Sequence, residues 1–171
     1  MSILTEPALQ YKDSFLQSLH EFHDEGQLLQ YDVQRLTRNF EEFLQHIHNQ
    51  QHPQTVQPDF VPHTSFWLID NNEFIGQLSI RHYLNDLLLK VGGNIGYQVR
   101  PSKRRHGYGK TILYLGLQKA REMGLPRALV TCDETNIGSK KVIEYNGCHF
   151  ENAVEVEGSP VKKLRYWIEL Q

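Results

Sequence analysis

The stretch NIGYQVRPSKRRHGYGKT, residues 94–111, decides the expected fold, because an apolar strand runs directly into a glycine-rich basic turn. The pattern of 94–100 predicts a strand, and Pro101 ends it because proline has no N–H to donate to a sheet. Apolar residues at helical spacing then predict a helix over about 106–123, which Gly124 terminates.

The basic turn has the composition of an anion-binding site. Its glycines allow the backbone to approach a ligand closely, and the first N–H groups of the helix lack partners inside the helix. Arg104, Arg105 and Lys110 add positive charge to the helix dipole, so a diphosphate is the expected guest. A nucleic-acid or sorting patch at 103–106 is the alternative, which the net charge of −2 and the absence of another basic run disfavour.

The rest of the chain alternates helical and extended segments. Two amphipathic helices are expected within about 7–48, the second capped by Asp32, and a polar, proline-containing loop follows at 49–63. The other predicted elements are a short helix at about 138–146 and strands at 65–70, 74–84, 128–132, 149–156 and 161–170. This order predicts an α/β (α+β) fold with a mixed, mostly antiparallel central sheet of six to seven strands flanked by helices.

Composition narrows the class of protein. The 171 residues, 39% hydrophobic and 22% charged, suit a single domain, with the helix pair at about 7–48, a core at about 65–150 and a C-terminal hairpin at about 149–170. We expect no nucleic-acid partner, no membrane partner and no transmembrane or leader segment. Cys132 and Cys148 form no CxxC pair, so a cytoplasmic location is expected. The nine histidines lack the spacing of a ligand set, so no metal is expected.

Residues 65–170 resemble the GNAT superfamily of N-acetyltransferases. The matching features are, in order, the strand 95–99, Arg104-x-x-Gly107-x-Gly109 opening a long helix, a strand ending at Cys132, Asn136, Ser139, a short helix and Gly147. The resemblance implies acetyl-CoA as co-substrate and a splay between the strands 94–100 and 128–132, with the pantetheine arm of the coenzyme pairing with the first strand.

The resemblance also implies the coenzyme contacts. The backbone of Val99 would face the arm, with Asn136 and Ser139 beside it, and the pyrophosphate would be held by the loop residues Arg104, Arg105, His106, Gly107, Tyr108, Gly109 and Lys110. An alternative for Asn136 and Ser139 is a purely local role, in which Asn136 shapes the turn and Ser139 caps the short helix.

Catalytic residues are less clear, because two positions depart from the family pattern. Many relatives carry a glutamate near the start of the key strand, where this chain has Gly92-Gly93-Asn94, and a tyrosine where it has Ile143. The catalytic residues are therefore unknown, and the candidates are Tyr97, His82, Glu134 and Tyr145. Cys132 is interpreted as a small core residue.

The function implied by the resemblance is transfer of an acetyl group from acetyl-CoA to a primary amine by direct attack in a ternary complex. The amine belongs to a small molecule or a peptide. The alternative is a CoA-binding regulatory module with little or no transferase activity, which the two departures motivate. A homodimer is left open, with the strand 161–170 and its Tyr166 and Trp167 as a potential interface.

Overall fold

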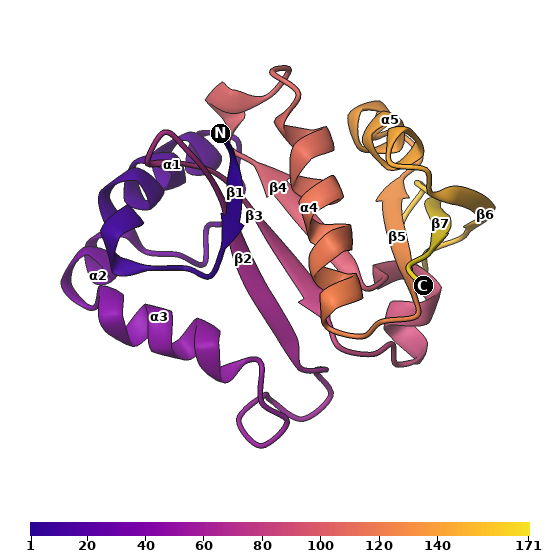
Figure 1. Ribbon diagram of the computed structural model, residues 1–171, viewed down its shortest axis with the longest axis horizontal. Helices are drawn as coiled ribbons and strands as arrows, with labels where there is room; N and C mark the ends of the chain where they lie inside the picture. The colour runs from indigo at the N-terminus through magenta and orange to yellow at the C-terminus, as the bar shows by residue number, and fades with distance from the viewer.

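A seven-stranded mixed sheet organises the chain in the computed structural model, which describes residues 1–171 (Figure 1). The strand order is β1-β2-β3-β4-β5-β7-β6, and every neighbouring pair is antiparallel except β4 and β5. The strands are β1 (Ile3–Thr5), β2 (His63–Asp70), β3 (Glu73–Arg81), β4 (Ile95–Val99), β5 (Arg127–Asp133), β6 (His149–Val154) and β7 (Lys163–Glu169). The mixed, mostly antiparallel sheet expected from the sequence is confirmed.

Helices cover both faces of the sheet, and each face has its own apolar core. The long helix α4 (Tyr108–Glu122) packs on one face against β3, β4 and β5, and α5 (Ile137–Tyr145) lies beside it. On the opposite face α1 (Lys12–Asp24), α2 (Val33–Arg38) and α3 (Phe40–Asn49) bury an aromatic cluster in which Phe15 stacks on Trp67 at 4.6 Å between ring centroids. No helix of the chain is long and apolar enough to span a lipid bilayer.

The sheet opens between β4 and β5. Their pairing is limited to Ile95 opposite Val130, whereas β4 pairs with β3 over five residues and β5 with β7 over seven. The expected splay between these strands is therefore confirmed. It opens toward the carboxyl end of β4, where the basic loop begins.

Asn94 closes the splay at its base. In the regular antiparallel pattern the N–H of Asn94 would donate to β3, but it donates instead to Leu129 O of β5 at 2.7 Å. Its side chain compensates, because Nδ2 donates to Arg81 O and Oδ1 accepts from Leu129 N at 2.8 Å. This residue is 4% exposed and joins three strands at one point.

Gly93 makes that junction possible. Its φ of 68° lies in the left-handed region, and a Cβ there would stand 2.5 Å from Leu129 O. The Gly-Gly-Asn segment, where the family pattern has a carboxylate, thus serves to join β4 to β5.

Several elements differ from the sequence predictions. The strand β1 was not predicted, and the second N-terminal helix is divided at Asn39, whose φ of −125° leaves the helical region. Asp32 does cap α2, accepting from Arg35 N. The expectation that the last strand offers Tyr166 to an interface is wrong, because β7 lies inside the sheet and Tyr166 is 1% exposed.

We predict that Asn94→Ala destabilises the protein by about 1–3 kcal/mol, because it leaves the buried N–H of Leu129 without its acceptor. Chemical denaturation measures the change. Gln77→Ala is the matched control, since it removes a half-buried side-chain hydrogen bond between β3 and β4 without affecting the junction. Equal losses in the two variants would contradict the role assigned to Asn94.

Candidate active site

The loop before α4 presents a row of unpaired backbone donors. The N–H groups of Arg105, His106, Gly107, Tyr108 and Gly109 donate to no acceptor in the protein, whereas those of Arg104 and Lys110 are used within the loop. Positive φ angles at Arg105 (67°) and Gly107 (86°) turn these groups into a concave array. Such an array at a helix start binds a multiply charged anion.

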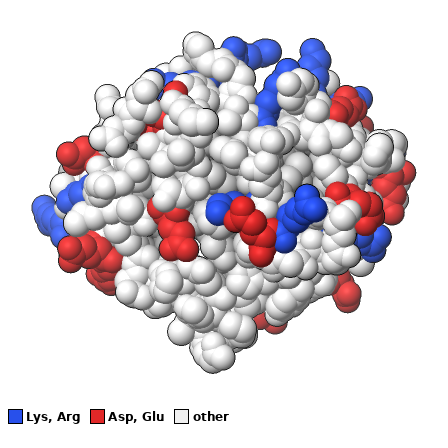
Figure 2. Space-filling view, in the orientation of Figure 1, with Lys and Arg blue, Asp and Glu red and all other residues white.

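The loop side chains are arranged less simply than the sequence suggests. Arg104 does not point into the loop, because its Nε donates to Val99 O at 3.1 Å and its Nη1 pairs with both oxygens of Glu25. Tyr108 points to the β2–β3 turn and donates to Asp70, a hydrogen bond that raises the pKa of its hydroxyl. Arg105, His106 and Lys110 are the exposed side chains of the turn, and Figure 2 shows basic side chains at the upper edge of the molecule, where α4 begins.

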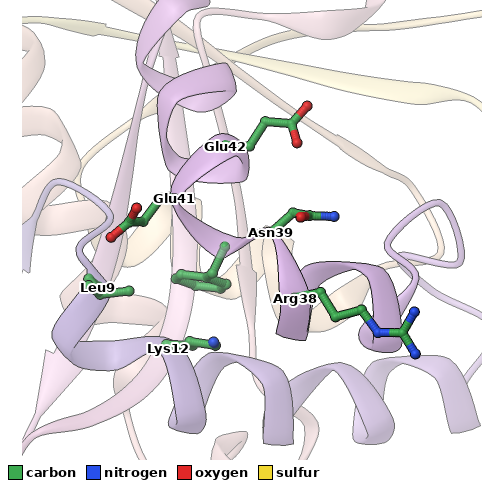
Figure 3. Close-up of a pocket in the computed structure, with 7 residues that line it drawn as sticks. Leu9, Lys12, Arg38, Asn39, Glu41 and Glu42 are labelled. Atoms are coloured by element: carbon green, nitrogen blue, oxygen red, sulfur yellow. The ribbon is translucent and has the colours of Figure 1, made fainter.

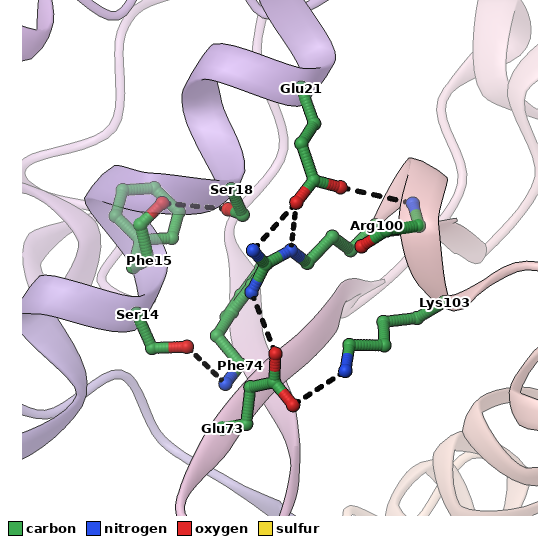
Figure 4. Close-up of polar contacts among 9 residues, drawn as sticks. Ser14, Phe15, Ser18, Glu21, Glu73, Phe74, Arg100 and Lys103 are labelled. Carbon is green, nitrogen blue, oxygen red and sulfur yellow. Dashed lines mark hydrogen bonds and ion pairs between the residues drawn. The ribbon is translucent and has the colours of Figure 1, made fainter.

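A buried ion-pair network anchors this loop to α1 (Figure 4). Arg100, whose side chain is 4% exposed, contacts Glu21 at 2.6 Å and Glu73 at 3.1 Å, and Lys103 contacts the second oxygen of Glu73. The backbone N–H of Ser102 donates to Glu21. Burial by itself would raise the pKa of Glu21, but the hydrogen bonds from Arg100 and Ser102 prevail and lower it.

The edge of β4 that faces the splay is free. Arg100 N donates to Ile75 O of β3, so by strand alternation Gln98 and Gly96 also face β3, and Tyr97 and Val99 face the diverging β5. The backbone of Tyr97 and the N–H of Val99 therefore lack a partner strand. An extended ligand can pair with this edge, although the carbonyl of Val99 accepts from Arg104 in this structure.

Tyr97 crosses the splay with its side chain. Its hydroxyl lies 2.9 Å from Ser139 Oγ, in the first turn of α5. Burial raises the pKa of Tyr97 to about 12, so the hydroxyl keeps its proton at neutral pH. Burial also raises the pKa of the nearby Cys132 thiol to about 11, which suits a core residue and not a nucleophile.

Asn136 has a local structural role that leaves part of its side chain unused. Its Oδ1 accepts from Ser139 N and so caps α5, while its Nδ2 donates to no group of the protein. The cap is therefore formed by Asn136 and not by Ser139. The free amide N–H₂ remains available at the mouth of the splay.

Three of the four catalytic candidates lie away from the splay between β4 and β5. Tyr145 is 67% exposed, and Lys110 Nζ lies 3.7 Å from the centroid of its ring. Glu134 accepts from the N–H of Lys162 and so holds the turn before β7. His82 is bonded to the buried Thr64, and burial lowers the pKa of its imidazole. Only Tyr97 reaches the splay.

A polar strip, formed by Gln77, Ser79, Arg81, Gly96 and Gln98, lies on the sheet face opposite α4 and was missed by the sequence reading. All five members lie at alternate positions of β3 and β4, Gly96 pairs with Ser79 in the register, and none is fully buried. The strict alternation of polar and apolar residues at 77–81 is the signal that would have revealed it, because it predicts one polar face for β3.

Two surface hollows lie elsewhere. One, of about 340 Å³, is formed where α1 meets the α2–α3 junction and is lined by Lys12 and Arg38 as well as Glu41 and Glu42 (Figure 3). Another of about 300 Å³ lies on the other side of Glu41 along α3. Neither includes a residue of the loop, β4 or β5, so neither bears on the anion-binding array.

Residues 9–149 match the family model described as the acetyltransferase (GNAT) domain. No curated protein matches the chain in sequence. Among solved structures, the microcin self-immunity acetyltransferase MccE, in complex with acetyl-CoA and AMP, is 13% identical and aligns with a TM-score of 0.69 over 98% of this chain and 92% of its own.

Two further structures align over nearly all of the chain. RimJ of Mycobacterium smegmatis, in complex with CoA-disulfide, is 20% identical with a TM-score of 0.68 over 98% of this chain and 81% of its own. A Salmonella typhimurium acetyltransferase that modifies the N-terminal serine of a 50S ribosomal subunit protein is 18% identical, with a TM-score of 0.65 and coverages of 98% and 94%. At these identities the likeness concerns the fold.

We predict that Gly107→Glu abolishes binding of CoA, because it places a carboxylate beside the free N–H groups. Gly124→Glu is the matched control: Gly124 has a φ of +85° against +86° at Gly107, a Cβ meets nothing within 4 Å at either position, and it follows the other end of α4. Both variants carry the same backbone strain. Calorimetric titration with CoA measures the effect, and retained binding in a folded Gly107→Glu protein would contradict the site.

Proposed function

This chain belongs to the GNAT acetyltransferase family, and we propose that it transfers the acetyl group of acetyl-CoA to a primary amine by direct attack within a ternary complex. Family membership makes it an acyltransferase with acetyl-CoA as the donor. The proposal further assigns the residues that bind the coenzyme and the residue that donates a proton.

The observation that carries the proposal is a continuous path from the loop to Tyr97. Five free N–H groups at Arg105–Gly109 suit the pyrophosphate, and the free edge of β4 at Tyr97 and Val99 suits the amide groups of the pantetheine arm. Asn136 Nδ2 would donate to the same arm. Arg104 would have to release the carbonyl of Val99 for that edge to pair completely.

Bound acetyl-CoA supplies the thioester whose carbonyl carbon is attacked by the lone pair of the amine. The N–H of Tyr97 faces the splay nearer its closed end than that of Val99, and it is suitably placed to polarise the carbonyl oxygen. When the carbon–sulfur bond breaks, its electron pair goes to sulfur, and the Tyr97 hydroxyl donates a proton there. The proton lost by the amine goes to water, and Tyr97 regains its proton from water, so the site returns to its starting state.

Tyr97 thus takes the part that many relatives give to a tyrosine at the position of Ile143. Its hydroxyl lies beside Ser139, one turn of α5 before the fully buried Ile143. The proton donor would therefore reach the splay from β4 instead of from α5. The Ser139 hydroxyl orients the Tyr97 hydroxyl through the hydrogen bond between them, in which either group can donate.

The alternative, a coenzyme-binding regulatory module, is separated from the enzyme by measuring free thiol. Acetyl-CoA is incubated with the protein and a pooled set of small and peptide amines, and CoA thiol release is followed. We expect amine-dependent release. Tight CoA binding without any amine-dependent thiol would support the module and contradict the enzyme.

We further propose a cytoplasmic location, which two free, buried cysteines, Cys132 and Cys148, support.

An exposed edge for self-association would be β6 and not β7, because β6 is the last strand of the sheet.

We predict that Tyr97→Phe lowers kcat by about tenfold to 100-fold, because it removes the proton donor while keeping the ring. KM for acetyl-CoA should change little. Tyr114→Phe, an exposed tyrosine of α4, is the control and should behave as the wild type. Because the pKa of Tyr97 is raised to about 12, no fall in kcat from its titration is expected up to about pH 10. Unchanged kcat in Tyr97→Phe would remove this residue from the mechanism.

A further inference from the structure

Arg81 is a cation without a counterion at the base of the splay. It is half-buried, and none of the ion pairs of the structure includes it. By contrast, the buried Arg100, directly after β4, contacts the carboxylates of Glu21 and Glu73. Burial is also the only cause that lowers the pKa of Arg81, so no carboxylate stabilises its charge.

The guanidinium is held in one orientation. Its Nη1 donates to Gly92 O at 3.3 Å and Gly93 O at 3.1 Å, the two carbonyls that precede the Asn94 junction. Nε and Nη2 make no hydrogen bond within the protein, yet the structure has no buried side-chain nitrogen or oxygen without a partner. These two groups are therefore accessible from solvent, and they form the free side of a planar fork.

The free side of the fork lies beside the reacting strand. A Cβ on Gly96 would stand 3.7 Å from Nη1 and 3.8 Å from Nη2 of Arg81, so the guanidinium lies over β4 at the residue before Tyr97. Since Gly96 has no side chain, the polar strip remains open there. The other side chains of the polar strip are uncharged: Ser79, Gln77 and Gln98.

The remaining titratable neighbour on this face brings no negative charge. His63 lies opposite Arg81 in the register of β2 and β3, and its Nδ1 lies 3.4 Å from Val61 O, which accepts from it. Burial, with Arg81 as a smaller cause, lowers the pKa of His63, so the imidazole is neutral at neutral pH. An acceptor on the polar strip therefore meets one fixed positive charge and no carboxylate from the strip.

We propose that Arg81 binds a carboxylate of the acceptor, and that the acceptor is an amine bearing this carboxylate close to its amino group, such as an amino acid or a short acidic peptide. The inference rests on the proposed function, because it places the acceptor on the polar strip. A two-point hydrogen bond from Nε and Nη2 fits a carboxylate in geometry and charge. The same charge repels polycationic acceptors such as polyamines.

The experiment compares matched acceptors by thiol release. Each pair consists of an amine with a carboxylate and the same amine as the carboxamide: single amino acids with their amides, and dipeptides with aspartate or asparagine in second place. We expect the carboxylate member to have a kcat/KM about tenfold or more above its amide. The amino-acid and dipeptide arms distinguish the two sources of the carboxylate, and a diamine serves as the cationic comparison.

Three variants assign that preference to Arg81. Arg81→Gln should bring the kcat/KM ratio within each pair to about one, and Arg81→Lys should keep part of it, since a lysine retains the charge without the fork. Arg165→Gln is the matched control, because Arg165 donates to Leu89 O and so holds the same 88–93 turn from the other side, but it is paired with Glu151. The ratio in Arg165→Gln should equal that of the wild type.

The outcomes separate the two proposals. A wild-type preference for the amides or the diamine, or equal loss in Arg81→Gln and Arg165→Gln, would overturn the role of Arg81 while leaving the transferase in place. If CoA binds but no amine releases thiol, the proposed function fails, and calorimetry with the same pairs on the CoA-bound protein still tests Arg81. Equal affinity for both members, or no binding of either, would then overturn the inference.

Discussion

The junction at Asn94 is the constraint on which the site depends. The backbone N–H of Asn94 donates to β5 instead of β3, and its side-chain amide donates to β3 in place of that N–H. The start of β4 is therefore joined to both neighbouring strands at this one residue. Beyond the adjacent pair of Ile95 and Val130 no further pairing joins β4 to β5, and the strands diverge with their natural twist. The free edge, the loop and Tyr97 all lie along the gap that results.

A second constraint holds the far end of the gap. Glu21 on α1 binds Arg100, and Glu25, directly after the end of α1, binds Arg104 at the start of the loop. Because Arg100 is buried, its charge needs these carboxylates, and the one from Glu21 specifies the position of α1. The helix α1 and the loop before α4 are in this way held to each other.

Between these two ends the chemistry is distributed differently from the family pattern. The position of the missing carboxylate is used for the strand junction, and Ile143 completes the core under α5. In the proposed mechanism a tyrosine on β4 offers the proton instead, and an arginine on β3 offers a positive charge to the acceptor.

Local patterns in the sequence determined the strands, α4, the caps at Asp32 and Gly124, and the anion-binding loop, because these depend on alternation, helical periodicity and glycine conformations within a few residues. The sequence did not predict β1, the division at Asn39 or the direction of the Arg104 side chain. Those depend on partners distant in the chain, such as Trp67 opposite Thr5 and Glu25 opposite Arg104. Only the tertiary structure decided that Tyr97 faces Ser139 and that Arg81 has no counterion, because each statement concerns side chains from strands and helices that the chain brings together only on folding.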